Sequence, residues 1–432
     1  MFTTVQMNIQ VKGHGELPYI MSANHFGPNL AQLMRLLKFA GIFLIVAGTI
    51  LGIVFYANWD AFRTVYENRD SITEGSEWVP KTYSIDGLLE YVLEHPEQVS
   101  IVSFSPDDQA DGIFYGSHIL RVYGSSGIAL HLGEFYRQVS ESLINPDSLI
   151  SADVPGRYVI RGIDESSFRN AVNDAAKAGY IDQNGNIRLE DLFYLNLVKG
   201  NLHVHDYMLM LLGRENMDSL VRNLGYEMDA PVPFTGLHIL SIGGLFNRTQ
   251  EDQLAYLERL DASTLFDMAW DYTGRFLTDD EFRDKVHAYT ERRGLNLNFI
   301  QMRRLYNLLP KMKPMDMALI MQAVHSRTYI TPEVSARVHE KLRWPENRAL
   351  IRNSMVNYAA AYDSRMSMLN GVDMGRSLGG QTERIQVVMF QQLPVSMWMH
   401  MSSNFINQEL QRLLVTDPVF RNKAASLTGA GN

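Results

Sequence analysis

The longest uninterrupted apolar run in the chain extends from Phe39 to Ala57 and carries no charged residue. As a helix rising ~1.5 Å per residue it would be about 28 Å long, close to the thickness of a bilayer's hydrocarbon core. A cleaved signal peptide has a shorter apolar region nearer the start of the chain, whereas here residues 1–38 precede the run. The pattern therefore predicts an uncleaved, single-pass transmembrane signal anchor over 39–58.

Charges on either side of this run indicate its orientation. Arg35 and Lys38 flank its N-terminal side, and Asp60 and Glu67 follow it. Because positive charge near a span favours the cytoplasmic side, we expect the N-terminus in the cytoplasm and the rest of the chain outside. The expected organisation is a cytoplasmic tail over 1–38, the anchor, a polar linker over 59–83, one domain over 84–415, and a C-terminal tail over 416–432.

Beyond the linker, apolar spacing changes from helical to alternating. Ser84 is a good helix cap, and Leu88, Leu89 and Val92 recur at helical spacing before Pro96. The stretch VSIVSFS, 99–105, alternates as a strand, and IFYGSHILRVYG, 113–124, predicts a second strand or two short ones. A helix followed by a hairpin is expected at the start of the domain.

The middle of the chain is dominated by helical patterns, and strand patterns return near the end. Helices are predicted over 130–143, 166–178 and 189–198, with further helical patterns up to 342. In 384–402 we expect strands, since Val395, Met397, Met399 and Met401 alternate with polar residues; a last helix is predicted over 404–415. This order predicts an α+β, two-lobe fold: an antiparallel sheet flanked by terminal helices, plus an all-helical lobe.

Composition excludes several kinds of partner and chemistry. The formal net charge is −9 with a pI near 5.8, and no long run of Lys and Arg occurs, so nucleic acid is not an expected partner. The chain has no cysteine, which excludes disulfides, thiolate metal ligands and a cysteine nucleophile.

Three stretches resemble the penicillin-recognising serine hydrolases, above all class A β-lactamases and D-Ala-D-Ala peptidases. They are YGSSGIALHLGEFYRQV (123–139), LEDLFYLNLVKGNLHVHDYMLMLLGRENMDSLVRNLG (189–225) and MKPMDMALIMQAVHSRTYITPEVSARVHEKLRW (312–344). The resemblance covers roughly 84–415. It implies a β-lactamase-like domain, with a Ser-x-x-Lys nucleophile, a Ser-Asp-Asn loop and a Lys-Thr-Gly strand as its site.

Each of these three site motifs is altered in this chain. Ser126 matches the family serine, but Ala129 stands where the lysine that accepts its proton would be. Lys199-Gly200-Asn201 stands for Ser-Asp-Asn and retains only the asparagine, whose side chain binds the substrate amide in the family. Arg376 and Ser377 are the preferred substitutes for Lys-Thr-Gly as a substrate-binding pair, and 363–367 is a second register.

Alternative interpretations of these residues remain open. Asn201 could be an ordinary helix cap, and His131, five residues after Ser126, is the nearest residue that could act as a base. His203 and His205 would diverge on a helix, so core or surface histidines are favoured over a metal pair, and no metal or cofactor is expected.

The leading hypothesis is a single-pass protein of the bacterial cytoplasmic membrane whose extracytoplasmic, periplasmic domain has lost the acylation machinery. It would bind or scaffold in the cell envelope, on a peptidoglycan peptide, a β-lactam-like ligand or an envelope protein complex. The alternative is an active serine hydrolase in which His131 or Lys199 activates Ser126. A third interpretation is a structural subunit in which the tail and the span matter most.

Overall fold

The computed structural model describes residues 68–197, 200–343, 355–378 and 383–429. The chain divides into two units, 1–64 and 65–432, and every described residue belongs to the second. The predicted span over 39–58 and Lys199 lie outside the described residues. Within the described ranges, no helix is both long enough and apolar enough to cross a bilayer.

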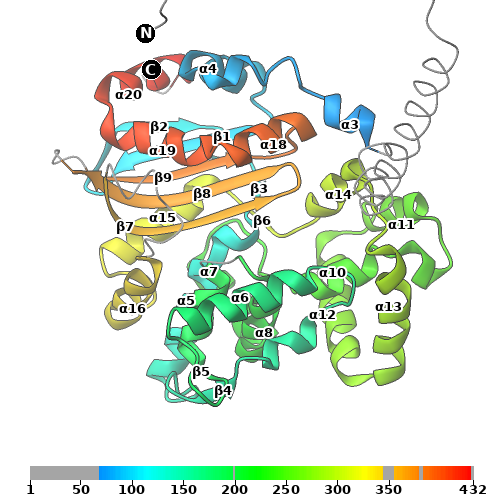
Figure 1. Cartoon of the computed structure of the whole chain (residues 1–432). Helices are drawn as coiled ribbons and strands as arrows, with labels where there is room; N and C mark the ends of the chain where they lie inside the picture. Colours follow the sequence, from blue (N-terminus) through cyan, green and yellow to red (C-terminus); the bar gives the residue numbers. More distant parts are fainter. Residues whose placement is uncertain (1–67, 198–199, 344–354, 379–382, 430–432) are drawn as a thin grey trace, which may run out of the picture. The chain divides into compact units, whose positions relative to one another are not determined.

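The centre of the described unit is a five-stranded antiparallel sheet in the order β2-β1-β9-β8-β7 (Figure 1). Its strands are β1 (Val99–Ser105), β2 (Asp108–Tyr115), β7 (Met355–Arg365), β8 (Met368–Ser377) and β9 (Glu383–Phe390). The first and last strands of the chain are neighbours, since Val99 pairs with Phe390 and Phe104 with Ile385. The predicted pairing of the two ends of the domain in one sheet is confirmed.

Alternating apolar side chains of the central strands supply two cores. Ile101, Val388 and Phe390 point to one face, and Val102 and Val387 point to the other. All five are fully buried. A strand buried on both faces has apolar residues at consecutive positions, which is why VSIVSFS and RIQVVMF are such strong strand patterns.

Helices from both ends of the domain cover the first face of the sheet (Figure 1). They are α3 (Arg69–Thr73), η1 (Lys81–Tyr83), α4 (Ile85–Glu94), α18 (Val395–Ser403), α19 (Ile406–Thr416) and α20 (Pro418–Leu427). Helix α4 begins as predicted, because the Ser84 hydroxyl accepts a hydrogen bond from the Gly87 amide at 3.1 Å. Its Leu88, Leu89 and Val92 are buried against the sheet.

The strand predicted over 395–402 is wrong, because these residues form helix α18. Pro394 immediately precedes the helix, a position that suits proline, and methionine is a strong helix former. The buried Met397, His400 and Met401 follow the helical spacing of three and four residues. The alternation of methionines with polar residues was therefore no evidence of a strand.

Both segments that flank the predicted domain pack onto it where they are described. From the linker, Trp78 is buried and its ring lies edge-on to Tyr91 of α4 at 5.2 Å. From the tail, Phe420 and Ala424 of α20 are buried in the same core. The compact unit thus extends beyond 84–415 in both directions.

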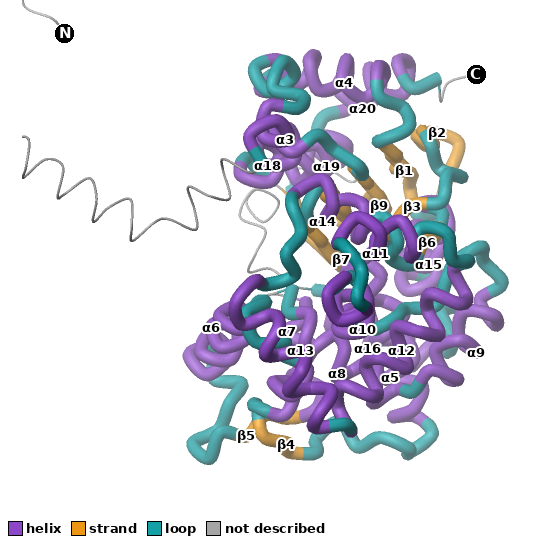
Figure 2. The backbone as a smooth tube through the Cα atoms, turned by 90° about the vertical axis from the view of Figure 1, so that its right-hand side faces the viewer, coloured by secondary structure: helices purple, strands orange, loops and turns teal. Residues whose placement is uncertain are grey.

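The second face of the sheet is covered by α15 (Pro314–His325) and α16 (Pro332–Leu342), and α5 (Ile128–Ser140) packs between α16 and helices α8 (Leu202–Leu212) and α9 (Arg214–Leu224). The remaining helices form a separate lobe below the sheet (Figure 2). They are α6 (Glu165–Lys177), α7 (Leu192–Leu197), α8 (Leu202–Leu212), α9 (Arg214–Leu224), α10 (Phe234–Leu240), α11 (Gln250–Leu257), α12 (Ala262–Thr278), α13 (Asp280–Arg293) and α14 (Phe299–Tyr306), with η2 (Gly124–Gly127), η3 (Val154–Tyr158), η4 (Leu189–Asp191) and η5 (Gly243–Phe246).

Two small antiparallel pairs interrupt this helical part of the chain. Strand β4 (Leu149–Ser151) pairs with β5 (Asn186–Arg188), and β3 (Arg121–Val122) pairs with β6 (Lys311–Met312). The predicted α+β, two-lobe arrangement is confirmed, but the helical lobe is not all-helical, since β4 and β5 lie at its far end (Figure 2).

Candidate functional site

Ser126, the predicted nucleophile, lies in the 3₁₀ turn η2 just before α5 and is 3% exposed. Its hydroxyl donates a hydrogen bond to the carbonyl of Tyr123, and its amide donates to the same oxygen at 3.1 Å. Among the described residues, no hydrogen bond links Ser126 to His131. The hydroxyl proton is therefore committed to a main-chain acceptor, which is not a base.

The neighbouring Ser125 is held by the end of strand β7. Its amide donates to the Asp363 carboxylate at 2.7 Å, and its hydroxyl accepts a hydrogen bond from the Arg365 guanidinium. Arg365 also pairs with Asp363 at 3.2 Å and lies 4.6 Å above the ring of Phe234. A guanidinium stays protonated and can only donate, so this contact holds the serine without activating it.

Of the two segments proposed to replace Lys-Thr-Gly, it is thus the second, 363–367, that contacts the serine turn. Arg376 and Ser377 lie at the opposite end of β8, where Arg376 pairs with Glu383 of β9. Asn370 of the same strand donates to the carbonyl of Val122, next to the serine turn. Arg376 is six positions further along the strand than Asn370, which corresponds to roughly 20 Å at ~3.4 Å per residue. The preferred substrate-binding pair is not brought to Ser126.

Asn201 acts as the N-cap of α8. Its side-chain oxygen accepts hydrogen bonds from the amides of His203 and Val204, both at 3.1 Å. Its amide nitrogen is buried and has no hydrogen-bond partner in the part of the chain that the structure describes. The polar residue at the mouth of this helix is a cap, and its unused donor is directed into the protein interior.

Asp206 is a buried carboxylate that sequence reasoning did not single out. It accepts hydrogen bonds from the amides of Phe234 at 2.9 Å and Thr235 at 2.7 Å, and it contacts the His205 ring at 3.1 Å. Burial would raise its pKa, but the hydrogen bonds from His205 and Thr235 outweigh burial and lower the pKa below the ordinary value. Asp206 is therefore ionised and ties α8 to the start of α10.

His131 lies against His205, with the ring centroids 4.4 Å apart and the ring planes tilted by 55°. Both rings are buried, and neither nitrogen of His131 makes a hydrogen bond within the described residues. Burial, followed by the neighbouring His205, lowers the pKa of His131 well below its ordinary value. His131 is thus a neutral ring that is not aimed at Ser126 by any hydrogen bond.

Two further histidines adjoin this group. His203 is buried at the start of α8, and burial lowers its pKa although Asp206 and Asp164 favour its charged form. His238 of α10 is also buried, and burial lowers its pKa to about 4. We call the five residues His131, His203, His205, Asp206 and His238 the histidine cluster.

His203 and His205, for which a core or surface role was favoured over metal binding, both lie in the histidine cluster. His205 faces His131, whereas His203 lies against Phe168 with the centroids 6.1 Å apart, so the two rings diverge as their spacing indicates. Within the described residues, no group of three His, Asp or Glu side chains has the geometry to hold a metal ion. The sequence signal for the cluster was the run His203-Val-His205-Asp206, but only the fold adds His131 and His238.

Comparison with known proteins gives likenesses of structure at low identity. The chain matches no family model and no curated protein. It resembles a β-lactamase from Sphaerobacter thermophilus (13% identity, TM-score 0.44, covering 76% of this chain and 95% of that one) and the reconstructed class A β-lactamase of the last common ancestor of Gram-negative bacteria (10%, 0.46, 76% and 96%). It also resembles the penicillin-binding protein PBP-A (11%, 0.43, 76% and 97%).

These structural neighbours are penicillin-recognising serine hydrolases. They belong to the family that the three sequence stretches resemble. At 10–13% identity, the roles of Ser126, Asn201 and Asp363 have to be derived from the contacts of this chain itself.

Proposed function

We propose that residues 65–432 are a β-lactamase-like module that does not hydrolyse its ligand and acts by binding or scaffolding in the cell envelope. The observation that supports this most directly is the state of the serine turn. Ser126 donates to a carbonyl, and Ser125 is clamped by the ion pair of Asp363 and Arg365. A serine without a base is a poor nucleophile, and the loss of general-base help typically costs 10²–10⁴-fold in rate.

The membrane part of the proposal comes from the sequence. Phe39–Ala57 is long enough to anchor the module once, and Arg35 and Lys38 favour a cytoplasmic N-terminus. The ligand classes that fit this location are a peptidoglycan peptide, a β-lactam-like molecule or a protein complex of the envelope.

A β-lactam should not acylate this protein. After incubation of the full chain with a fluorescent penicillin, we expect no labelled band and an unchanged intact mass, because the Ser126 hydroxyl donates to a main-chain carbonyl and no described base is hydrogen-bonded to it. A penicillin-binding protein with a long-lived acyl-enzyme serves as the positive control, since a class A β-lactamase would hydrolyse the label away, and Ser126→Ala is the matched variant. A stoichiometric adduct on Ser126 that disappears in Ser126→Ala would reject the non-hydrolytic module.

The same experiment examines the second function, a serine hydrolase that uses His131. One observation favours it: Asp206 contacts His205, and the His205 ring lies against that of His131, so a row of adjacent groups leads from a buried carboxylate to α5. A small movement of η2 would be needed to bring the Ser126 hydroxyl to the ring. If His131→Gln removed an adduct that the unaltered chain forms, this second function would replace the first.

The topology can be measured independently of the chemistry. With an epitope at each end, protease added to intact spheroplasts should remove the C-terminal epitope and spare the N-terminal one, because Arg35 and Lys38 retain the tail in the cytoplasm. Lysed spheroplasts are the control in which both epitopes are accessible. Loss of the N-terminal epitope alone from intact spheroplasts would show the opposite orientation.

A further inference from the structure

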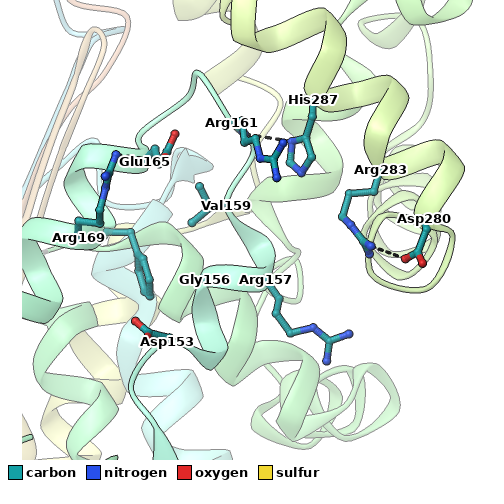
Figure 3. Close-up of a pocket in the computed structure, with 11 residues that line it drawn as sticks. Asp153, Gly156, Arg157, Val159, Arg161, Glu165, Arg169, Asp280, Arg283 and His287 are labelled. Carbon is teal, nitrogen blue, oxygen red and sulfur yellow. Dashed lines mark hydrogen bonds and ion pairs between the residues drawn. The ribbon is translucent and has the colours of Figure 1, made fainter. Parts of the chain in front are cut away.

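A recess of about 570 Å³ lies in the helical lobe, away from the serine turn. It opens between the segment that starts at η3, the first turn of α6, and helix α13 (Figure 3). Arg157 and Arg161 approach from the η3 segment, and Arg283 and His287 come from α13. Neither Ser126 nor any member of the histidine cluster lines it, so it is separate from the site described above.

Cationic groups predominate slightly among the lining residues, which include four arginines and three carboxylates. Arg169 pairs with Glu165 at 3.0 Å, Arg283 pairs with Asp280, and Arg161 pairs with Glu291 at 3.2 Å. Arg157 has no ion pair or side-chain hydrogen bond within the described residues. Its guanidinium therefore has all of its donors available for a ligand.

His287 adds a neutral donor to the same recess. Its Nδ1 accepts a hydrogen bond from the amide of Arg161 at 3.2 Å, so in the neutral ring the proton lies on Nε2. Burial, followed by the positive charge of Arg161, lowers the pKa of His287 below its ordinary value. At neutral pH, Nε2–H is a donor without a partner among the described residues.

The recess also has an apolar wall, formed by Val159 and Phe168. Its volume falls in the range of small-molecule sites, which are mostly apolar with a few placed polar groups. A guanidinium recognises a planar or tetrahedral oxyanion through paired hydrogen bonds better than any other side chain does. The combination suits a molecule with one anionic end and one apolar end.

We propose that this recess binds a small organic anion, a carboxylate or phosphate monoester carried on an apolar group, with Arg157 as the principal contact to the anion. Val159 and Phe168 contact the apolar group. This binding site is independent of the serine turn.

Calorimetric titration of the detergent-solubilised full chain tests the proposal with four probes: phenyl phosphate, benzoate, inorganic phosphate and benzyl alcohol. We expect saturable binding of phenyl phosphate or benzoate that weakens with added salt, and weaker or absent binding of inorganic phosphate and benzyl alcohol. Absence of saturable binding for both aromatic anions up to ~10 mM would overturn the proposal. Equal affinity for inorganic and phenyl phosphate would overturn the assigned ligand class.

Two arginine variants make the test specific. Arg157→Gln should weaken binding of the aromatic anion about tenfold or more, because a hydrogen bond to a charged group is lost. Arg259→Gln is the matched control: Arg259 is exposed, has no ion pair within the described residues and does not line the recess. Both variants remove one positive charge, so an equal loss in both, or no loss in Arg157→Gln, would contradict the assigned contact.

Discussion

Acidification from about pH 7.5 to about pH 5 is expected to destabilise residues 65–432 strongly, well before most carboxylates titrate. Burial lowers the pKa values of His131, His203 and His238 in the folded protein, whereas in the unfolded chain histidine titrates near ~6.5. Below that pH the unfolded state binds more protons than the folded state. The stability contributed by the neutral histidines is therefore complete above about pH 6.5 and is lost as the pH falls.

His238 gives the scale of the effect. Asp164 and Asp206 favour its charged form, and Arg365 and His203 oppose it, but burial is the largest influence and lowers the pKa to about 4. Between pH 6.5 and 5 this residue alone should cost about 2 kcal/mol of the free energy of unfolding. Burial also lowers the pKa values of His131 and His203, so these residues act in the same direction. The contribution of His238 alone is an appreciable part of the 5–15 kcal/mol typical of a folded domain.

Urea unfolding followed by circular dichroism at several pH values between about 5 and 8 would measure this. His238→Gln should flatten the dependence of unfolding free energy on pH, whatever it does to stability at neutral pH. His118→Gln, at an exposed histidine, is the matched control and should leave the slope unchanged. A slope that His238→Gln does not alter would show that the pKa of His238 is not lowered in the folded protein.

Strands β1 and β9 and helix α4 could be predicted because local signals and tertiary packing agree there, whereas β7 and β8 were not predicted. Ser84 caps α4, apolar spacing places Leu88 and Val92 on one face, and both predictions are met in the fold. The central strands are apolar at consecutive positions because both of their faces are buried. In these elements a single chain segment contains all the information needed.

The prediction of a strand over 395–402 was wrong because the alternation of Met397, Met399 and Met401 is compatible with both a strand and a helix. Methionine packs irregularly and has no strand preference, so the pattern alone did not distinguish between them. The proline at 394 was the better signal, since it often precedes or begins a helix.

The candidate site was predicted less well, because its contacts join segments far apart in the sequence. Ser126 could be found from a motif, but its acceptor, Tyr123, depends on the shape of the turn. Asp363 and Arg365 meet Ser125 only because the β7–β8 hairpin turns after Arg365, which pairs with Met368. The sequence offered two candidates for the substrate-binding segment, 363–367 and Arg376 with Ser377. The preferred one, Arg376, lies at the end of β8 that is far from the serine turn.

The hydrogen-bond partners of buried polar groups could not be predicted from the sequence either. Asp206 looks like an ordinary helix residue in the sequence, yet it accepts two main-chain hydrogen bonds from the start of α10. Sequence periodicity reports which residues are apolar, and it does not report which carboxylate will receive partners from a distant loop. The cores are therefore specified locally, whereas the contacts of the serine turn are specified by a few residues distant in the sequence.

Truncation after Pro394 should abolish folding of residues 65–432. The truncated chain lacks α18, α19 and α20, which together with α4 cover the first face of the sheet (Figure 1). Leu410 and Leu414 are fully buried against that face, and Met397 and Met401 are buried beside them. Each buried side chain of this kind contributes about 1.5–3 kcal/mol, so four of them match the whole stability of an ordinary domain.

Point variants test the same packing in a chain that still folds. Leu410→Ala should lower the free energy of unfolding by about 2–5 kcal/mol, because it leaves a cavity between α19 and the sheet. Val419→Ala, at a residue that is 79% exposed on α20, is the matched control and should change stability by less than about 0.5 kcal/mol. Urea unfolding of both variants provides the measurement, and circular dichroism with size-exclusion chromatography reports whether the truncated chain folds. A truncated chain that remains folded and monomeric would show that the sheet does not need its C-terminal helices, and an unchanged Leu410→Ala would show that α19 does not pack on it.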